Sequence, residues 1–227
     1  MRKPKWTETA WIKFMLKLIA TVTGNVVSIS GGNNKMGHVP SVSLPALIYC
    51  IMCGCRAKCY ANRLEKFRKN IREAYARNAK ILKNNPAEYW RQVREAIAKT
   101  KFFRFHVSGE IPNYEYFCEM VESSIQNPHC QILCFTKKYA IVNTWIKLHG
   151  DSAEALPKNL HILFSAWKGL KMENPYNLPE AHVRYKDGTT TAKEGAIHCF
   201  GNCETCYLAG CGCWALKCGE QLELDEH

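Results

Sequence analysis

The spacing of its cysteines constrains this chain more than any other feature. The count of thirteen is odd, and ten of the thirteen crowd into two short windows of a 227-residue chain that is long enough to bury a core. Such crowding favours metal binding over a disulfide framework. The first window contains Cys50, Cys53, Cys55 and Cys59, and the second contains Cys199, Cys203, Cys206, Cys211, Cys213 and Cys218.

The first window suits an iron–sulfur cluster. Four thiols within ten residues occupy a tight loop, which has no interior to bury them in. A cluster takes several thiolates from one loop, and a loop that supplies only three ligands leaves one iron open to another molecule. Two alternatives stay open. Cys50 and Cys53 have the spacing of half a zinc site, although no second pair lies nearby, and the thiols could instead be redox-active.

The second window predicts a closed metal site. Cys199, Cys203 and Cys206 form a compact C-x3-C-x2-C group, and Cys213, which precedes Trp214, can supply a fourth thiolate. Four protein ligands would complete a cluster and make it structural or electron-transferring. Zinc bound by four thiolates is the alternative. Cys211 and Cys218 are read as spare thiols, although which of the three later cysteines bind is not decided by the spacing.

The middle of the chain alternates between strand and helix patterns. Short aromatic and β-branched runs begin near residues 102, 130 and 160, and helical patterns cover residues 114–125 and 139–148 between them. A repeat of this length is typical of strand–helix units, so we expect an α/β fold with a parallel sheet. Further patterns predict an early strand at residues 26–30, a helix at 62–84, and a second helix from Pro86 that Asn85 caps.

The final quarter of the chain lacks such periodicity. Turn signals follow residue 170, and the last thirty residues are rich in Gly and Cys. We therefore predict two units, an α/β domain at residues 1–170 and a segment at 171–227 that metal orders and that packs on the first.

The charge is divided unevenly along the chain. Residues 1–110 carry 21 Lys and Arg against 6 Asp and Glu, whereas residues 111–227 carry 10 against 14. A basic half attracts polyanions such as nucleic acid, but such charges also line the solvated faces of helices. No uncharged apolar run is long enough to cross a membrane, and no secretory signal is recognised, so we expect no membrane partner and a cytoplasmic location.

Six motifs follow one another along the chain. They are SGGNNKMG at residues 30–37, SLPALIYC at 43–50, CRAKCYA at 55–61, FRFHVSGEIPNYEYF at 103–117, FTKK at 135–138, and the closing C-x3-C-x2-C group with its later Cys-Trp pair. In this order they resemble the phage gene product 88 family, which itself resembles radical S-adenosylmethionine (SAM) enzymes. The resemblance spans roughly residues 25–215.

The resemblance implies a fold and a chemistry. The fold is a partial (βα) barrel, and the chemistry is reductive cleavage of SAM at a 4Fe-4S cluster held by three cysteines. By position those ligands are Cys50, Cys55 and Cys59, with Cys53 the alternative for the first or second. The spacing differs from the usual C-x3-C-x2-C, and Lys58 occupies a position that is usually aromatic. A flavodoxin or ferredoxin would supply the electron, and a second cluster in the C-terminal segment would relay electrons or bind substrate.

The resemblance also implies a cofactor site and two catalytic candidates. Ser108, Gly109 and Glu110 match the element that receives the SAM amino group, and Tyr60 would lie against the cofactor. Because catalytic residues of strand–helix barrels gather at the carboxyl ends of strands, Glu110 and His106 are the catalytic candidates. Lys137 and Lys138 could meet an anionic group at the next strand end.

Two other functions remain as alternatives. The chain could be a nucleic-acid-binding module whose metals only brace it, or an iron–sulfur protein that uses the same fold for sulfur or electron transfer.

Overall fold

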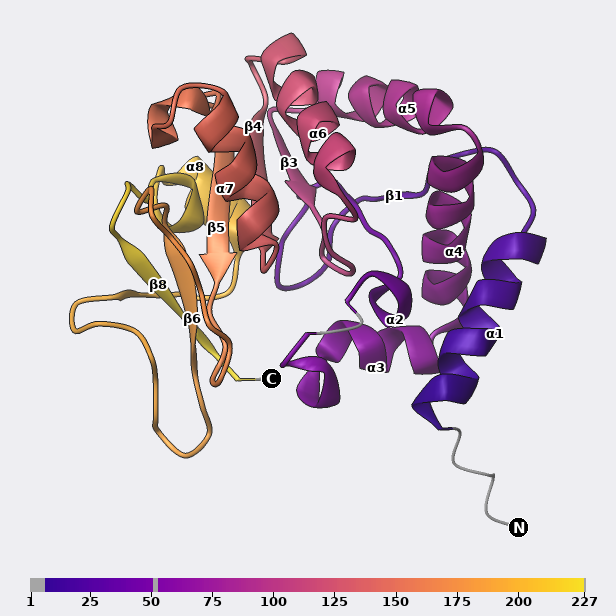
Figure 1. Cartoon of the computed structure of the whole chain (residues 1–227), viewed down its shortest axis with the longest axis horizontal. Coiled ribbons are helices and arrows are strands. Elements are labelled where there is room, and N and C mark those ends of the chain that lie inside the picture. The colour runs from indigo at the N-terminus through magenta and orange to yellow at the C-terminus, as the bar shows by residue number, and fades with distance from the viewer. Residues whose placement is uncertain (1–6, 51–52, 227) are drawn as a thin grey trace.

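The computed structural model describes residues 7–50 and 53–226, and its centre is one sheet of eight strands (Figure 1). The strand order is β1-β2-β3-β4-β5-β6-β8-β7. β1 pairs antiparallel with β2, and every other neighbouring pair is parallel. The strands are β1 (Ile29–Ser30), β2 (Ser41–Val42), β3 (Phe102–Phe105), β4 (Gln131–Thr136), β5 (Leu160–Ser165), β6 (Glu180–Arg184), β7 (Ile197–His198) and β8 (Gln221–Asp225).

The order of the strands confirms the prediction of a parallel α/β sheet but not of a barrel. β1 and β7 are the two ends of the order, so the sheet is open within the described residues. Strands β2 to β6 follow one another in space as they do in sequence, which is the arrangement that successive crossovers in one direction produce.

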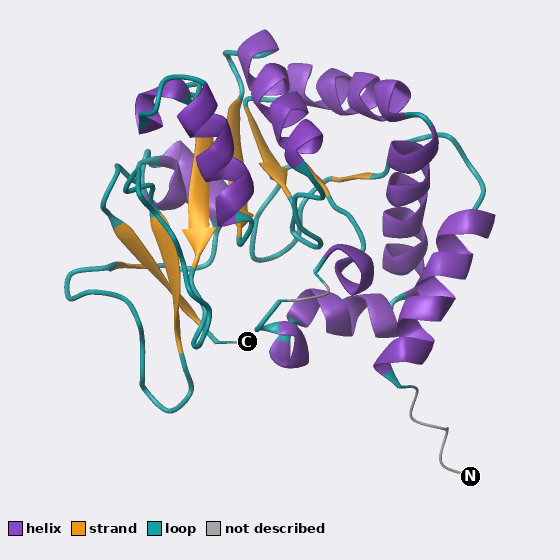
Figure 2. Ribbon diagram, viewed as in Figure 1, coloured by secondary structure: helices purple, strands orange, loops and turns teal. Residues whose placement is uncertain are grey.

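The helices are shown in purple in Figure 2. They are α1 (Glu8–Thr21), α2 (Ala46–Tyr49), α3 (Tyr60–Phe67), α4 (Lys69–Asn84), α5 (Pro86–Ala98), α6 (Tyr114–Gln126), α7 (Tyr139–Leu148) and α8 (Cys203–Leu208), with 3₁₀ turns η1 (Arg56–Lys58), η2 (Ala153–Ala155) and η3 (Gly212–Trp214). Asn85 caps α5 as predicted, because its side-chain oxygen accepts the amide of Glu88 at 3.1 Å. No described helix is long and apolar enough to cross a bilayer.

The single helix predicted at residues 62–84 is wrong, because the chain bends at Arg68 and forms α3 and α4. Arg68 has extended backbone angles. The guanidinium of Arg72 reaches back to the carbonyl oxygens of Glu65 and Lys66, at 2.9 and 3.1 Å. These are carbonyls of the last turn of α3 that have no partner within the helix, so the bend leaves them satisfied.

The two faces of the sheet are covered by different parts of the chain. Alternate strand residues, among them Phe103, Ile132 and Phe164, pack on one face against α5, α6 and α7. Leu133 and Leu163 point to the second face, where they pack with Trp214 and with four cysteines of the second window, namely Cys199, Cys203, Cys206 and Cys213. Cys130 and Cys134 are buried in the first core, as expected of small apolar side chains, and Cys118 is half-buried.

Residues beyond 170 extend the same sheet and cover its second face. They supply β6, β7 and β8, and α8 rests against the loop at residues 30–37. Gly37 has φ +68°, and a Cβ there would lie 2.5 Å from that of Glu204 on α8. His38 donates its amide to the Glu204 carboxylate at 2.8 Å, and Glu204 donates its own to Met36 at 3.0 Å. The motif SGGNNKMG therefore builds the docking surface for α8.

Candidate metal centres

The first cysteine window lies between short helices at the edge where the parallel strands end. Cys50 ends α2, η1 follows, and Cys59 is the N-cap of α3. Arg56 fastens this loop, because its guanidinium donates to the carbonyls of Cys50 and Leu47, at 3.0 and 3.2 Å, and pairs with Glu8 of α1. Residues 51 and 52 lie outside the described part of the chain.

Three of the four sulfurs in this window come together. The Sγ atoms of Cys53 and Cys55 are 2.8 Å apart, and Cys55 is also hydrogen-bonded to Cys59. Sharing a proton with Cys55 lowers the pKa of Cys53 and that of Cys59 to about 6 and raises the pKa of Cys55. Cys50 lies apart from these hydrogen bonds. Burial raises the pKa of Cys50 most, and the negative charge of Glu110 raises it further. The structure thus groups Cys53 with Cys55 and Cys59. The family resemblance implied Cys50 as the third ligand, with Cys53 as the alternative.

A buried carboxylate beneath the window went unnoticed in the sequence. Glu65 of α3 is fully buried, and it accepts the amides of Ala46 and Leu47 at 2.6 and 3.3 Å and the hydroxyl of Ser108 at 2.6 Å. Burial raises the pKa of Glu65 to about 7, against these hydrogen bonds. Glu65 therefore caps α2 and joins the cysteine loop to the segment after β3.

The tripeptide Ser108-Gly109-Glu110 is a buried strap at the ends of β3 and β4. Gly109 has φ +87°, and a Cβ there would come within 2.5 Å of the Leu44 carbonyl oxygen, so only glycine fits. Glu110 accepts hydrogen bonds from the Thr136 hydroxyl at 2.6 Å and the Lys137 amide at 2.8 Å. It also accepts the amide of Ile111 at 2.9 Å, which leaves about one of the roughly four acceptor positions of the carboxylate.

Lys137 brings a positive charge to the first window. Burial alone would lower the pKa of Lys137, but Cys55, Cys53 and Glu110 together raise it. The Lys137 ammonium group therefore lies within electrostatic reach of the thiols of Cys53 and Cys55. Lys138 lies at the N-cap of α7, where its amide donates to Thr136 Oγ1 at 2.9 Å.

His106 does not join the cysteines. Its φ of +61° sets it in the left-handed region, and its ring lies 5.4 Å from that of Tyr116 on α6. It is 5% exposed, and neither ring nitrogen has a partner at hydrogen-bonding geometry in the described chain. Burial lowers the pKa of His106 to about 3, so the imidazole is neutral. The structure places this catalytic candidate on the helix-covered face.

Tyr60 lies close to both cysteine windows. It is the first residue of α3, follows Cys59, and donates its hydroxyl to the Val107 carbonyl at 2.6 Å. Burial raises the pKa of Tyr60, and the charged groups that act on it include Arg104, Cys59, Lys137 and Cys203. Cys203 belongs to the second window, so the fold brings two segments that lie 140 residues apart in sequence toward one side chain.

The second window packs on the face of the sheet that no long helix covers. Cys203 and Cys206 lie on α8, and Cys213 lies in η3. Burial raises the pKa of Cys213, with smaller contributions from Cys203 and Cys199, and burial raises that of Cys206 to about 11, with Cys211 contributing. Cys199, Cys203, Cys206 and Cys213 thus lie in one packed cluster, and Cys211 lies near Cys206, although Cys211 and Cys218 are both exposed.

Aromatic side chains enclose this second window. The rings of Phe102 and Tyr207 are 4.5 Å apart, and Trp214 Nε1 donates to the Cys203 carbonyl at 2.8 Å. Gly212 has φ +59°, and a Cβ there would lie 3.2 Å from Cys206 Sγ. Cys213 is buried among these rings, and Cys203 is half-buried, as are the four cysteines of the first window.

The geometry of the described residues does not choose a metal for either window. Among residues 7–50 and 53–226, no three Cys, His, Asp or Glu side chains are arranged to hold one metal ion. A cluster assigns each thiolate to its own iron atom, so its ligands need not surround a single point. An iron–sulfur cluster in either window therefore stays a prediction.

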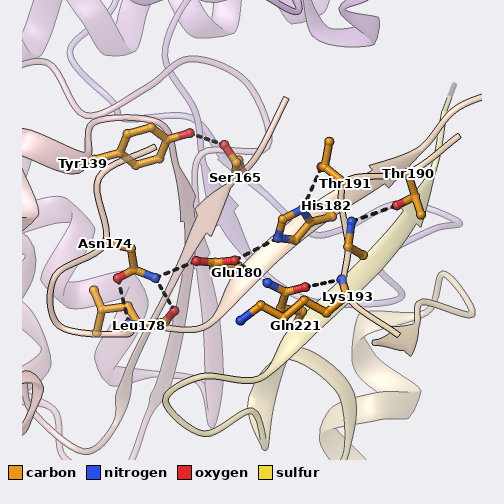
Figure 3. Close-up of polar contacts among 11 residues, drawn as sticks. Tyr139, Ser165, Asn174, Leu178, Glu180, His182, Thr190, Thr191, Lys193 and Gln221 are labelled. Atoms are coloured by element: carbon orange, nitrogen blue, oxygen red, sulfur yellow. Dashed lines mark hydrogen bonds and ion pairs between the residues drawn. The ribbon is translucent and has the colours of Figure 1, made fainter. Parts of the chain in front are cut away.

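A polar network that the sequence did not reveal fastens the long loop between β6 and β7 (Figure 3). Glu180 accepts from Gln221 at 2.6 Å and contacts His182 Nε2 at 2.9 Å, and the other nitrogen of His182 lies 2.8 Å from the Thr191 hydroxyl. Lys193 donates its amide to Gln221 at 2.7 Å. The polar groups of these residues hydrogen-bond to one another, so we interpret the network as one that stabilises the loop.

Several basic side chains of the first half also act inside the fold. On α4, Arg77 donates to the Thr23 carbonyl at 3.0 Å and Lys80 to that of Val22 at 2.7 Å. Arg91 of α5 pairs with Glu88 and Glu95. The excess of positive charge therefore has uses within the protein, and binding to nucleic acid stays a prediction.

A family model described as Gene product 88 matches residues 17–209. The chain belongs to the Gene product 88 family. No curated protein and no solved structure matches it. The Gene product 88 match includes the whole first window and Cys199, Cys203 and Cys206, and it ends before Cys211, Cys213 and Cys218. This match carries no assignment to radical SAM enzymes, so that resemblance stays a prediction.

Proposed function

We propose that this protein is an iron–sulfur enzyme that resembles radical SAM enzymes and cleaves SAM reductively at a 4Fe-4S cluster in the first window. The observation that supports this most is the meeting of the Cys53, Cys55 and Cys59 sulfurs beside Lys137 and Glu110. They meet at the edge where parallel strands end, which is where α/β proteins build their ligand sites. When bound, a cluster with three cysteine ligands supplies one open iron and an electron.

The surrounding residues have separate tasks in this proposal. Cys53, Cys55 and Cys59 hold the cluster, and the Lys137 ammonium offsets its negative charge. Glu110 holds the ends of β3 and β4 together through Thr136 and the Lys137 amide and keeps about one acceptor position for a donor such as an amino group. Gly109 lets the strap approach the Leu44 backbone closely. The second window holds an auxiliary cluster closed by protein thiolates, on a sheet that resembles a partial barrel.

The test is anaerobic purification or reconstitution followed by three measurements. Iron and sulfide are quantified, the reduced protein is examined by electron paramagnetic resonance with and without SAM, and deoxyadenosine and methionine are assayed. We expect iron with matching sulfide, a SAM-dependent change in the spectrum, and cleavage products. Zinc without sulfide would contradict the iron–sulfur assignment.

Iron and sulfide without any response to SAM would leave an iron–sulfur protein and reject the SAM chemistry. Cys118→Ser is the matched control, because Cys118 is a half-buried thiol on α6 that lies outside both windows. It should behave as the unchanged protein does in all three measurements.

A further inference from the structure

Arg104 of β3 places a guanidinium against the second window. Its central carbon lies 4.7 Å from the centre of the Phe135 ring, and its Nη1 lies 3.8 Å from Cys203 Sγ. Its Nε is buried and has no hydrogen-bond partner within the described residues. The side chain therefore lies flat on an aromatic ring on the second face of the sheet, with one edge toward the sulfur.

Within the described chain, the Arg104 guanidinium also lacks a carboxylate, the usual partner of a partly buried arginine. No carboxylate there lies within 4.0 Å of Arg104, whereas Arg94 pairs with Glu119 and Arg184 with Asp225. Arg104 is half-buried, and shielding its Nε from water without an acceptor is costly, so a nearby anion would stabilise the guanidinium.

Thiols are the groups that can provide this anion. Cys203 is in contact with Arg104, and Arg104 also acts electrostatically on Cys213. Tyr60 and Cys134 lie within its electrostatic reach as well, but neither belongs to the second window. A deprotonated Cys203–Cys213 pair that binds metal would complete the charge balance.

We propose that Arg104 is a positioning residue that orients and neutralises the Cys203 and Cys213 thiolates when the second window binds metal. This inference rests on the part of the proposed function that gives this window a metal. Residues that hydrogen-bond to metal ligands commonly alter affinity by 10- to 100-fold, and hydrogen bonds to cluster sulfurs set the reduction potential.

The first experiment isolates the second window and uses Co²⁺ alone as the probe. In a full-length background with Cys53, Cys55 and Cys59 changed to Ser, Co²⁺ is titrated into the metal-free, reduced protein, and thiolate-to-cobalt absorption is followed. We expect Arg104→Met to weaken binding by at least about tenfold. Arg104→Lys should lie between, because it keeps the charge but loses the planar fork.

Arg184→Gln is the matched control. Arg184 is an exposed arginine near His198, next to Cys199, and it pairs with Asp225 instead of a thiol. It should leave Co²⁺ affinity unchanged. Equal affinities in Arg104→Met and Arg184→Gln, with both variants folded by circular dichroism, would overturn the inference, and so would a background that binds no Co²⁺ at all.

The second experiment uses the protein with both windows loaded with iron and sulfide. Arg104→Met should make one of the two reduction potentials more negative, because the reduced cluster carries more negative charge and loses a nearby cation. The expected tenfold fall in the equilibrium constant for reduction corresponds to about 59 mV for one electron. The potential of the first window serves as the internal reference.

The outcomes separate the inference from the proposed function. A protein without SAM cleavage whose Co²⁺ affinity and second potential both depend on Arg104 would reject the enzyme and keep the inference. SAM cleavage together with reduction potentials and Co²⁺ affinities that do not depend on Arg104 would keep the enzyme and reject the inference.

Discussion

The two cysteine windows differ in how the fold holds them. The first is a loop between short helices, joined to the rest of the protein by polar groups such as Arg56, Glu65 and Lys137. The second packs among aromatic and aliphatic side chains on the face of the sheet, with Arg104 as the cation beside Cys203. A polar edge can admit a small molecule and direct it, whereas an enclosed apolar site favours retention of its metal. In the proposed function, the first window accordingly takes the reactive role and the second the closed role.

Removing one sulfur from each set breaks this comparison most directly. Cys55→Ser should lose the metal of the first window and all SAM cleavage, leaving about half of the bound iron if both windows hold clusters. Cys53→Ser should lose more iron than Cys50→Ser, because Cys53 shares the sulfur hydrogen bond and Cys50 does not. Iron and sulfide analysis measures both effects. A larger loss in Cys50→Ser would restore the ligand set that the family resemblance implied.

The polar support of the first window should appear as a pH dependence of stability. The pKa of Glu65 is raised from 4.5 to about 7 in the folded protein. The folded state therefore holds an extra proton between these values, so the stabilisation is full below about pH 4.5 and is lost as pH rises through about 7. The loss is on the order of 3 kcal/mol.

Urea denaturation of the metal-free protein between pH 5 and 8 measures this loss as the difference between the unchanged protein and Glu65→Gln, because the lowered pKa values of Cys53 and Cys59 add a contribution of opposite sign to both. Glu65→Gln should remove the part of the slope that falls with pH, whereas the exposed Glu95→Gln should leave the slope as it is. The same slope in both variants would show that Glu65 does not carry the effect.

Backbone fit near the first window can be tested with a pair of glycines. Gly109→Ala should destabilise the protein by about 3 kcal/mol, because a strained φ adds to a clash with the Leu44 carbonyl. Gly188→Ala, with φ +80° but open space around its Cβ, should cost about 1 kcal/mol. Chemical denaturation measures both values. If the two variants were equally stable, the close approach at Gly109 would have no energetic weight.

The smallest effect concerns the enclosure of the second window. Trp214→Phe removes the hydrogen bond to the Cys203 carbonyl and should cost about 1 kcal/mol. Metal should then leave the second window faster when a chelator is added, with the first window unchanged. Trp167→Phe is the counterpart, because the Trp167 ring lies beside Gly54 of the first window. Faster loss from the second window in that variant would mean that the two windows are not independent.

The elements with a local cause could be predicted from the sequence. The strands near residues 102, 130 and 160 follow from aromatic and β-branched runs, and the start of α5 follows from Asn85 and Pro86. The bend at Arg68 could not be predicted, since it depends on Arg72 reaching the carbonyls of α3. In the same way, Glu65 looks like an ordinary acid of an amphipathic helix until α2 is placed against it.

For the candidate sites too, features with a local cause could be predicted from the sequence, and features that depend on distant contacts could not. Cysteine spacing named both windows, because ligands of one site lie close in sequence. The choice between Cys50 and Cys53 depends on which sulfurs meet, and the role of Arg104 depends on β3 lying next to α8, a contact between residues 99 apart. His106 was expected with the cysteines because it follows a strand, but its positive φ turns the ring toward Tyr116.

The docking of α8 on the loop at residues 30–37 sets an order of events during synthesis. The cysteines of the second window are translated after the surface that receives them, which comes from the loop at residues 30–37 and from β3, β4 and β5. If that site binds metal as proposed, its loading must wait until residues 199–213 have emerged, whereas the Cys50–Cys59 loop is translated well before them. The protein would in that case acquire its two inorganic centres in sequence.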